Sequence, residues 1–202
     1  VPELEEYMDN LRKSGNLHAG IEAGNQNQLV MDSSVPTGNG LQVASLYYEF
    51  PLGDFTVTAG PRFDQDDVIS ATTGIYSSAF RVAEMPWATA GDTGAGVGVS
   101  YLADNGWNGS FNLLSQDGSA EVSTVGAFTE EGTDMYTASI GYDATNYGGG
   151  IVYTAEDQVG DSTKDQSIGA GVYFRPDGFP TISLALDKLD DKTNDIGPNG
   201  DN

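Results

Sequence analysis

Alternation of apolar and polar residues, repeated in nine short segments, limits the folds open to this chain more than any other feature. Each segment is roughly ten residues long, and alternate residues of a β-strand point to opposite faces. A strand of this length can cross a bilayer when it is tilted. The pattern predicts an all-β chain of antiparallel strands, at residues 16–24, 41–50, 54–62, 94–103, 107–115, 133–143, 147–155, 167–175 and 179–187.

The connections between these segments alternate in length. Short turns rich in Asp, Asn, Gly and Pro ("PLGD", "DNG", "ATN", "PDG") join the segments in pairs. Long polar stretches separate the pairs, at 63–93, 116–132 and 156–166. This places the long loops at one end, which is the layout of outer-membrane barrels. We therefore expect an up-and-down transmembrane β-barrel at 16–187, an N-terminal connecting segment at 1–15 and a polar acidic tail or loop at 188–202.

The two faces of the expected strands differ in chemistry. Between 136 and 142, tyrosine, alanine and isoleucine occupy the even positions, whereas threonine, serine and glycine occupy the odd ones. Aromatic residues stand at both ends of such apolar stripes, as in the interfacial girdles of membrane barrels. The expected membrane-interface aromatics are Phe50, Phe55, Tyr101, Trp107, Tyr136, Tyr142, Tyr147 and Tyr153.

The charged residues and the absence of cysteine exclude several classes of function. Thirty Asp and Glu against eight Lys and Arg give a formal charge of −22, which argues against nucleic acid as a partner. The absence of cysteine removes disulfides and thiolate metal sites. Segments 94–103, 107–115 and 147–155 carry no charge, as a lipid-facing strand requires. His18 and Glu22 alternate with apolar residues, so both are expected to face the lumen.

The stretch "YYEFPLGDFTVTAGPRFDQDD" (47–67) resembles the cyanobacterial outer-membrane porins, a group related to carbohydrate-selective porins and often called iron-uptake porins. "GAGVGVSYLADNGWNGSFNLLS" and "TASIGYDATNYGGGIVYT" resemble the next two hairpins, and the likeness runs over about 16–187. It implies a large, trimeric outer-membrane barrel for passive diffusion of small hydrophilic solutes and inorganic ions, with sugars as further candidates. Nine segments are fewer than the family's full barrel, so the chain is interpreted as a portion of a larger porin barrel.

The longest connection, 61–91, is the candidate pore constriction. By resemblance it follows the strand that ends in "GPR" and folds into the lumen. Two bases, Arg62 and Arg81, would then oppose four acids and set up a transverse field that filters solutes by charge; the acids are Asp64, Asp66, Asp67 and Glu84. The alternative is a solvated outer loop whose acids only add solubility.

Other chemistry-bearing patterns are weaker. A single histidine forms neither a His-rich metal site nor a defensible catalytic triad. The acids of 187–195 could bind calcium but lack the spacing of an EF-hand, so a solvated segment is favoured. "GAGVG" at 94–98 lies within a strand, where small residues let the wall bend or a loop pack closely. No enzyme activity, cofactor or resident metal is predicted.

The favoured function is passive transport through a porin in the cell outer membrane. The expected partners are membrane lipid, small solutes and ions and, from the resemblance, two further copies in a homotrimer. Acidic loops would raise the local cation concentration at the mouth of the pore. The alternative is a secreted acidic β-sandwich that binds carbohydrate, calcium or a cell surface through its long loops.

Overall fold

The computed structural model describes residues 14–23, 40–71, 88, 93–118, 126–127, 129, 132–157 and 164–190. These residues form nine β-strands and one short 3-10 helix, η1 (Gln65–Val68). The strands are β1 (Asn16–Ala23), β2 (Leu41–Leu52), β3 (Phe55–Asp64), β4 (Thr93–Leu102), β5 (Trp107–Ser115), β6 (Asp134–Asp143), β7 (Tyr147–Asp157), β8 (Lys164–Phe174) and β9 (Ile182–Asp190).

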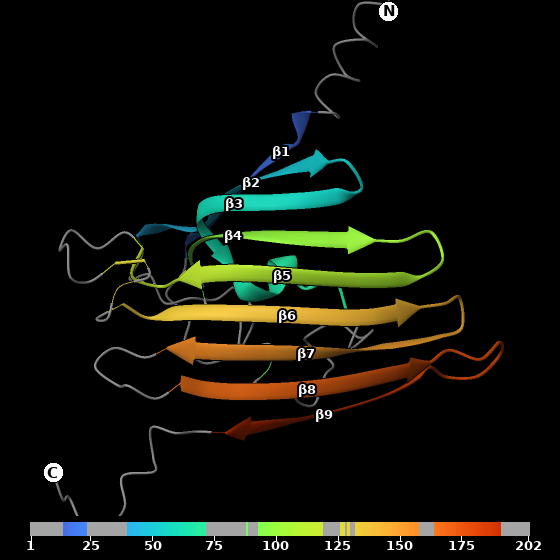
Figure 1. The fold of residues 1–202 in the computed structure, drawn as a ribbon. Helices are drawn as coiled ribbons and strands as arrows, with labels where there is room; N and C mark the ends of the chain where they lie inside the picture. Colours follow the sequence, from blue (N-terminus) through green and yellow to red (C-terminus); the bar gives the residue numbers. More distant parts are fainter. Residues whose placement is uncertain are drawn as a thin grey trace, which may run out of the picture.

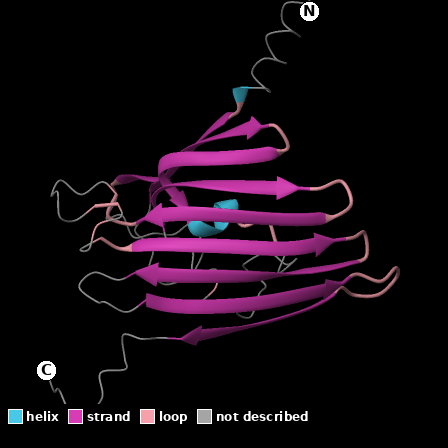
Figure 2. Cartoon of the chain, viewed as in Figure 1, coloured by secondary structure: helices cyan, strands magenta, loops and turns pink. Residues whose placement is uncertain are grey.

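The nine strands form one antiparallel sheet in the order of the sequence (Figure 1). Figure 2 shows that strands account for most of the described chain and that η1 lies against one face of the sheet. β1 and β9 form the two edges and are not neighbours, so the sheet is open. The all-β, antiparallel up-and-down fold is therefore confirmed, whereas the closed barrel stays a prediction.

Tight turns join the strands in pairs at one end of the sheet, and the strand ends that the longer connections join lie at the other end (Figure 1). Three of these turns contain a glycine with positive φ: Gly53 at 64°, Gly106 at 94° and Gly178 at 75°. Residues with a Cβ rarely adopt this left-handed conformation, which explains why the turns "PLGD", "DNG" and "PDG" carry glycine.

Successive strands are staggered in one direction. Directly paired residues can be followed from strand to strand across the sheet. The series that starts at Leu52, the last residue of β2, ends at Leu186, which lies four residues inside β9 (Ile182–Asp190). The strands have therefore shifted by four residues over seven strand-to-strand steps. A stagger of about half a residue per strand corresponds to a strand tilt of roughly 20°, given about 3.3 Å per residue and about 4.8 Å between strands. Strands tilt in a consistent sense in closed barrels too, by about 35–45°.

The buried core lies between the sheet and the residues that follow β3. One cluster joins Phe63 and Val68 to Leu114 of β5 and Met135 of β6. A second cluster joins Ala71 and Ala88 to Val152 of β7. The connection expected at 63–93 therefore begins with a structured segment that packs on one face of the sheet.

Candidate functional site

One face of the sheet exposes its apolar side chains. On β6 and β7 the directly paired residues Ile140 and Ile151 are 55% and 48% exposed, and on β9 Leu184 is 65% exposed. Water-soluble proteins rarely leave so large an apolar surface uncovered. We call this surface the apolar face; its exposed members are Leu17, Ile21, Val43, Tyr48, Leu52, Phe55, Val97, Tyr101, Trp107, Phe111, Ile140, Tyr147, Ile151, Tyr153, Ile168, Val172, Phe174, Ile182, Leu184 and Leu186.

Most of the expected interface aromatics gather where the short turns are. Ring centroids lie 5.3 Å apart in Phe55 and Tyr101, and 5.4 Å apart in Trp107 and Tyr142. The six aromatics at the short-turn ends of their strands are Phe50, Phe55, Tyr101, Trp107, Tyr142 and Tyr147. Tyr136 and Tyr153 lie nearer the long-loop ends of β6 and β7. The expected aromatics thus form a row at the short turns, whereas only Tyr136 and Tyr153 lie toward the long-loop ends.

The apolar face contains a shallow hollow near its aromatic row. The hollow has a volume of about 260 Å³ and a lining dominated by apolar atoms. The rings of Phe55, Tyr101 and Phe111 surround Gly109, which contributes no side chain. A Cβ at Gly109 would meet only the Ser139 carbonyl oxygen, at an ordinary distance of 3.4 Å, so neighbouring atoms do not require glycine there.

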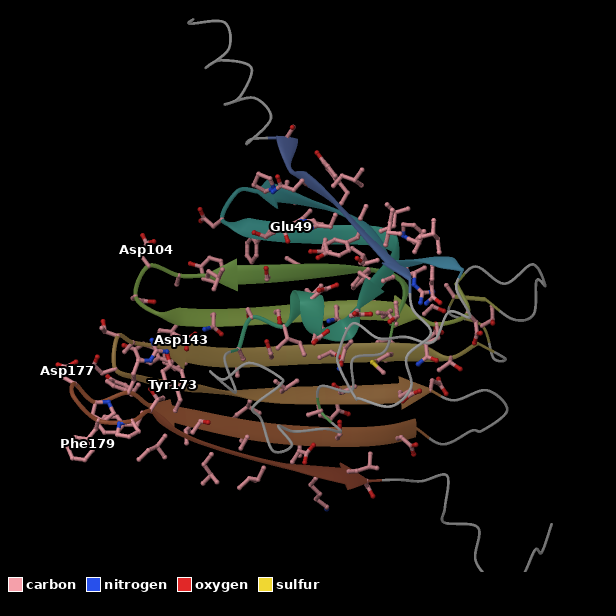
Figure 3. The ribbon with its side chains drawn as sticks, turned by 180° about the vertical axis from the view of Figure 1, so that it is seen from behind. Glu49, Asp104, Asp143, Tyr173, Asp177 and Phe179 are labelled. Atoms are coloured by element: carbon pink, nitrogen blue, oxygen red, sulfur yellow. The ribbon has the colours of Figure 1, made fainter. Side chains whose placement is uncertain are left out.

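The opposite face of the sheet is polar and buried. Asn112 and Thr137 are each 1% exposed and Thr154 is 4% exposed. Other buried polar side chains on the same face are Thr58, Asn108, Ser139 and Ser167. We call it the covered face, because residues 65–71, named here the covering segment, and Ala88 lie over it; Figure 3 views the molecule from this side.

Gln65 fastens the covering segment to the sheet. Its side chain is fully buried, and its Nε2 donates to Oγ1 of Thr137 and of Thr154, each at 2.7 Å. A third acceptor, the Ala88 carbonyl oxygen, lies 3.2 Å away and also accepts from Thr154 at 2.8 Å. In return, Asn112 Nδ2 donates to the Gln65 carbonyl oxygen at 2.9 Å. Gln65 thereby links the covering segment to β6 and β7 through its side chain and to β5 through its main-chain carbonyl.

Glycines make room for the covering segment. A Cβ at Gly98 would lie 2.5 Å from Val68 Cγ1, and one at Gly150 would lie 2.6 Å from Ala71 Cβ. Distances this short require one of the two groups to move. Further along, the Ser70 N–H donates to Ser110 Oγ at 3.1 Å. Of the two roles expected for small residues in "GAGVG", the close packing of a loop is the one that Gly98 fulfils.

The acids of the constriction hypothesis lie around η1. Asp64 precedes this helix in a capping box with Asp67, whose Oδ2 accepts from the Asp64 N–H at 3.1 Å. Thr93 Oγ1 donates to Asp64 Oδ1, and the Asp66 and Asp67 side chains are exposed. Arg62 instead donates from Nε to the Ala44 carbonyl oxygen of β2 at 2.9 Å. Arg81 and Glu84 lie outside the described residues, so the opposing-charge arrangement remains a prediction.

Asp67 has a perturbed acidity. The protein atoms around its carboxyl desolvate it, although the side chain keeps solvent exposure, and this desolvation raises its pKa above the ordinary value of 3.8. The negative charge of Asp64 raises the pKa further, while the hydrogen bond from the Asp64 N–H and the proximity of His18 lower it. The net direction is upward, so Asp67 ionises less readily than an isolated aspartate.

His18 lies on the covered-face side of β1. Its ring stacks on the Tyr47 ring, with centroids 4.6 Å apart. The Tyr47 ring in turn lies edge-on to the Phe63 ring, with centroids 6.0 Å apart. This position agrees with the face expected from the alternation. Glu22 belongs to β1 and its backbone pairs with Gln42, but its side chain lies outside the described residues. The role of both residues as lumen lining stays a prediction.

Sequence reasoning missed a second polar cluster, near the short turns. Asp143 accepts from Tyr173 Oη at 2.9 Å and from Asn108 Nδ2 at 2.8 Å. Arg175 lies over the Tyr173 ring, 5.4 Å from its centroid. Figure 3 shows Asp143 and Tyr173 near the turns that carry Asp104 and Asp177. The sequence shows that Asp143 is a charge at the end of a strand, but no local pattern indicates its partners Asn108 on β5 and Tyr173 on β8.

No known family model, curated protein or solved structure matches this chain. Among the described residues, none forms a helix long and apolar enough to cross a membrane. In the same part of the chain, no group of three or more His, Cys, Asp or Glu could hold a metal ion.

Proposed function

We propose that this chain forms part of the wall of an outer-membrane porin, with its apolar face in lipid and its covered face toward a water-filled pore. The cargo is small hydrophilic solutes and inorganic ions, moving by passive diffusion. The porin family, the outer-membrane location and the homotrimer come from the sequence resemblance described above.

The inverted distribution of polarity carries this proposal. Thr137 is buried while Ile140, three residues later on the same strand, is 55% exposed. A sheet in water would gain by the opposite arrangement, because each buried Leu or Ile side chain contributes about 1.5–3 kcal/mol. In lipid the same arrangement is favourable, since a membrane barrel alternates apolar residues outward with polar residues inward.

The covered face has the chemistry of a hydrated surface. Oδ1 of Asn108 and of Asn112 are buried and have no hydrogen-bond partner among the described protein atoms. A buried acceptor without a partner costs about 1–3 kcal/mol, which a bound water removes. Serine and threonine hydroxyls lie beside these amides, so this face offers hydrogen-bonding groups to water outside the two apolar clusters around Leu114 and Val152.

The covering segment would narrow the pore. It runs from the end of β3 across β4, β5, β6 and β7, held by Gln65 and by its close approach to Gly98 and Gly150. Asp66 and Asp67 sit on its exposed side and would attract cations at the narrowest point. The raised pKa of Asp67 means that this attraction weakens as the medium becomes acidic. The transport mechanism is therefore diffusion past a fixed acidic constriction, with no catalytic step.

Fluorescence quenching by brominated lipids tests the placement of the apolar face. Trp107 is 53% exposed on that face, and Trp87→Phe leaves it as the only tryptophan. In vesicles made with brominated phosphatidylcholine we expect strong quenching of Trp107 relative to ordinary vesicles. A second variant, Ile140→Lys, is expected to lower vesicle insertion by about 2–4 kcal/mol. The matched control, Asn105→Lys in the exposed β4–β5 turn, should leave insertion unchanged within about 0.5 kcal/mol.

Planar-bilayer conductance tests the channel itself. We expect stable ohmic steps from the refolded chain in its assembled form, and a reversal potential in a salt gradient that indicates cation preference. A chain that stays soluble without detergent, with unquenched Trp107, would refute the membrane placement and favour the secreted binding protein instead.

A further inference from the structure

One position in the apolar face lacks a side chain although its neighbours are large. Directly paired residues cross this face in the order Leu52, Phe55, Tyr101, Gly109, Ile140 and Ile151. Along β5, Gly109 stands between Trp107 and Phe111, whose side chains lie exposed on the same face. The shallow hollow of about 260 Å³ lies over this glycine.

Neither the backbone nor the packing requires glycine at position 109. Gly109 is not among the glycines with positive φ, and β5 pairs with β4 and β6 without a register shift, so no bulge is present. A Cβ there would meet the Ser139 carbonyl oxygen at an ordinary 3.4 Å. A glycine inside a strand often marks a bulge, a bend or a place where a ligand approaches closely. The last of these fits Gly109, because the hollow lies directly over it.

The hollow has the shape and chemistry for part of a lipid chain. It begins at Phe55 and Tyr101, in the aromatic row near the short turns, and extends to Val99 and Phe111, two residues further along β4 and β5. Its lining is dominated by apolar atoms. An engineered cavity of about 150 Å³ accepts a benzene ring. The larger hollow can therefore take up several methylene groups of an acyl chain, an argument that rests on the proposed placement of this face in lipid.

The turns beside the hollow are acidic. Asp54 directly precedes Phe55, and Asp104 follows Tyr101 in the β4–β5 turn (Figure 3); both side chains are exposed. These two turns are neighbours, because Phe55 and Tyr101 are directly paired. Among the described residues, the base that follows a strand at this end of the sheet is Arg175, after β8 and three strands from β5. Negative charge here repels an anionic head group and attracts a cationic one.

We propose that the hollow over Gly109 binds a phospholipid with a primary ammonium head group, such as phosphatidylethanolamine. The acyl chain lies on Gly109 between Tyr101 and Phe111. The ammonium group donates hydrogen bonds to the carboxylate of Asp54 or Asp104, and such charge-assisted bonds are stronger than neutral ones. Phosphatidylcholine has no N–H on its nitrogen and phosphatidylglycerol is anionic, so neither lipid makes this contact.

Head-group-dependent quenching of Trp107 tests the site. Trp87→Phe leaves Trp107 as the only tryptophan, two residues from Gly109 on the same face. The chain is placed in phosphatidylcholine vesicles that contain a small share of brominated phosphatidylethanolamine or of brominated phosphatidylglycerol. We expect the ethanolamine lipid to be about two- to fivefold enriched beside Trp107, as exposed charge pairs allow. Equal quenching by the two lipids, or stronger quenching by phosphatidylglycerol, would overturn the proposal.

A second reporter separates the site from the overall negative charge of the protein. Val172→Trp, in a Trp87→Phe/Trp107→Phe chain, places the tryptophan on the apolar face of β8, where Val172 is 58% exposed. General repulsion of phosphatidylglycerol acts on both reporters, whereas the ammonium site acts on Trp107. A preference for phosphatidylethanolamine of the same size at both reporters would therefore contradict a site at Gly109.

Two kinds of variant identify the residues of the site. Gly109→Leu fills the hollow and should abolish the preference, whereas Ala170→Leu, on the same face of β8, should preserve it. Asp54→Asn/Asp104→Asn leaves the hollow intact and should also abolish the preference. If the preference survives in both the Gly109→Leu chain and the Asp54→Asn/Asp104→Asn chain, the assignment is wrong.

The remaining outcomes distinguish this site from the proposed function. Strong quenching of Trp107 by both lipids without preference would leave the porin proposal standing and remove the lipid site. No quenching by either lipid would remove both. A change of oligomeric state in Gly109→Leu, measured by light scattering in detergent, would assign the hollow to a second copy of this chain and would also overturn the inference.

Discussion

Replacing Gln65 by leucine should release the covering segment from the sheet. Leucine has a similar size, so packing is largely kept while the amide donor is lost. Gln65 makes two short donor bonds, to Thr137 and Thr154, both at 2.7 Å. Each is worth about 1 kcal/mol net, and the hydroxyls left less well paired add up to about 1 kcal/mol. The docked state should therefore weaken by about 2–3 kcal/mol, or about 30- to 150-fold.

Thiol labelling measures this release directly. Ser139 is 8% exposed beneath the covering segment, and its Oγ lies 2.6 Å from Ser110 Oγ. A Ser139→Cys variant carries the only thiol of the chain, so its maleimide labelling rate reports how often the segment opens. Adding Gln65→Leu should raise that rate by the factor given above. The same substitution at the exposed Gln166 should change it by no more than about twofold.

Restoring an apolar environment should recover part of the loss. Adding Thr137→Val and Thr154→Val to Gln65→Leu removes the two hydroxyls that the lost amide leaves less well paired. The Ala88 carbonyl oxygen loses both of its side-chain donors in this variant, so the recovery should be partial. An unchanged labelling rate in Gln65→Leu, or an equal rise in Gln166→Leu, would refute the view that the amide holds the segment in place.

Three further predictions address other parts of the molecule. Gly98→Val should displace the covering segment and raise thiol labelling, because a Cβ there lies 2.5 Å from a side-chain carbon of the segment, whereas Gly109→Val on the apolar face should not. The raised pKa of Asp67 means that the folded state binds more protons than the unfolded state at pH values just above 3.8. The free energy of unfolding should therefore fall as the pH rises through that range. Thermal melts recorded at a series of pH values should show a smaller fall in Asp67→Asn. Tyr173→Phe removes a 2.9 Å hydrogen bond to Asp143 and should lower the free energy of unfolding by about 1.5–3 kcal/mol in denaturant titrations; an effect below about 0.5 kcal/mol would contradict the assigned bond.

Most of the strand pattern could be predicted from sequence because its signals are local. The strand expected at 107–115 is β5 (Trp107–Ser115), and that at 133–143 is β6 (Asp134–Asp143) within one residue. The last two strands differ more: β8 begins at Lys164, three residues before the expected 167, and β9 forms at Ile182–Asp190 in place of 179–187. Pro180 cannot donate to the ladder, so β9 starts later, and its charged end pairs with Gln166 and Ser167 of β8.

The covering segment could be predicted only in outline. The length of the connection after β3 and the resemblance predict that it folds inward, and the charges of Asp64, Asp66 and Asp67 are its most visible feature in the sequence. The side chain that fixes the segment is the neutral Gln65, whose acceptors lie 72 and 89 residues further along the chain. Nothing local distinguishes such a glutamine, because its role depends on which residues the sheet brings beneath it.

These separations also set an order of events during folding. Every strand pairs with its neighbour in sequence, so the four hairpins with tight turns each form by closing a short loop, and the longer connections then bring one hairpin beside the next. The acceptors of Gln65 reside on β6 and β7, so they do not exist as a site until both strands have joined the sheet. The Gln65 side chain must therefore wait for the later hairpins, although Asn112 of β5 can already donate to the Gln65 carbonyl oxygen. A chain halted before Thr154 would hold a sheet on which the covering segment is only partly anchored.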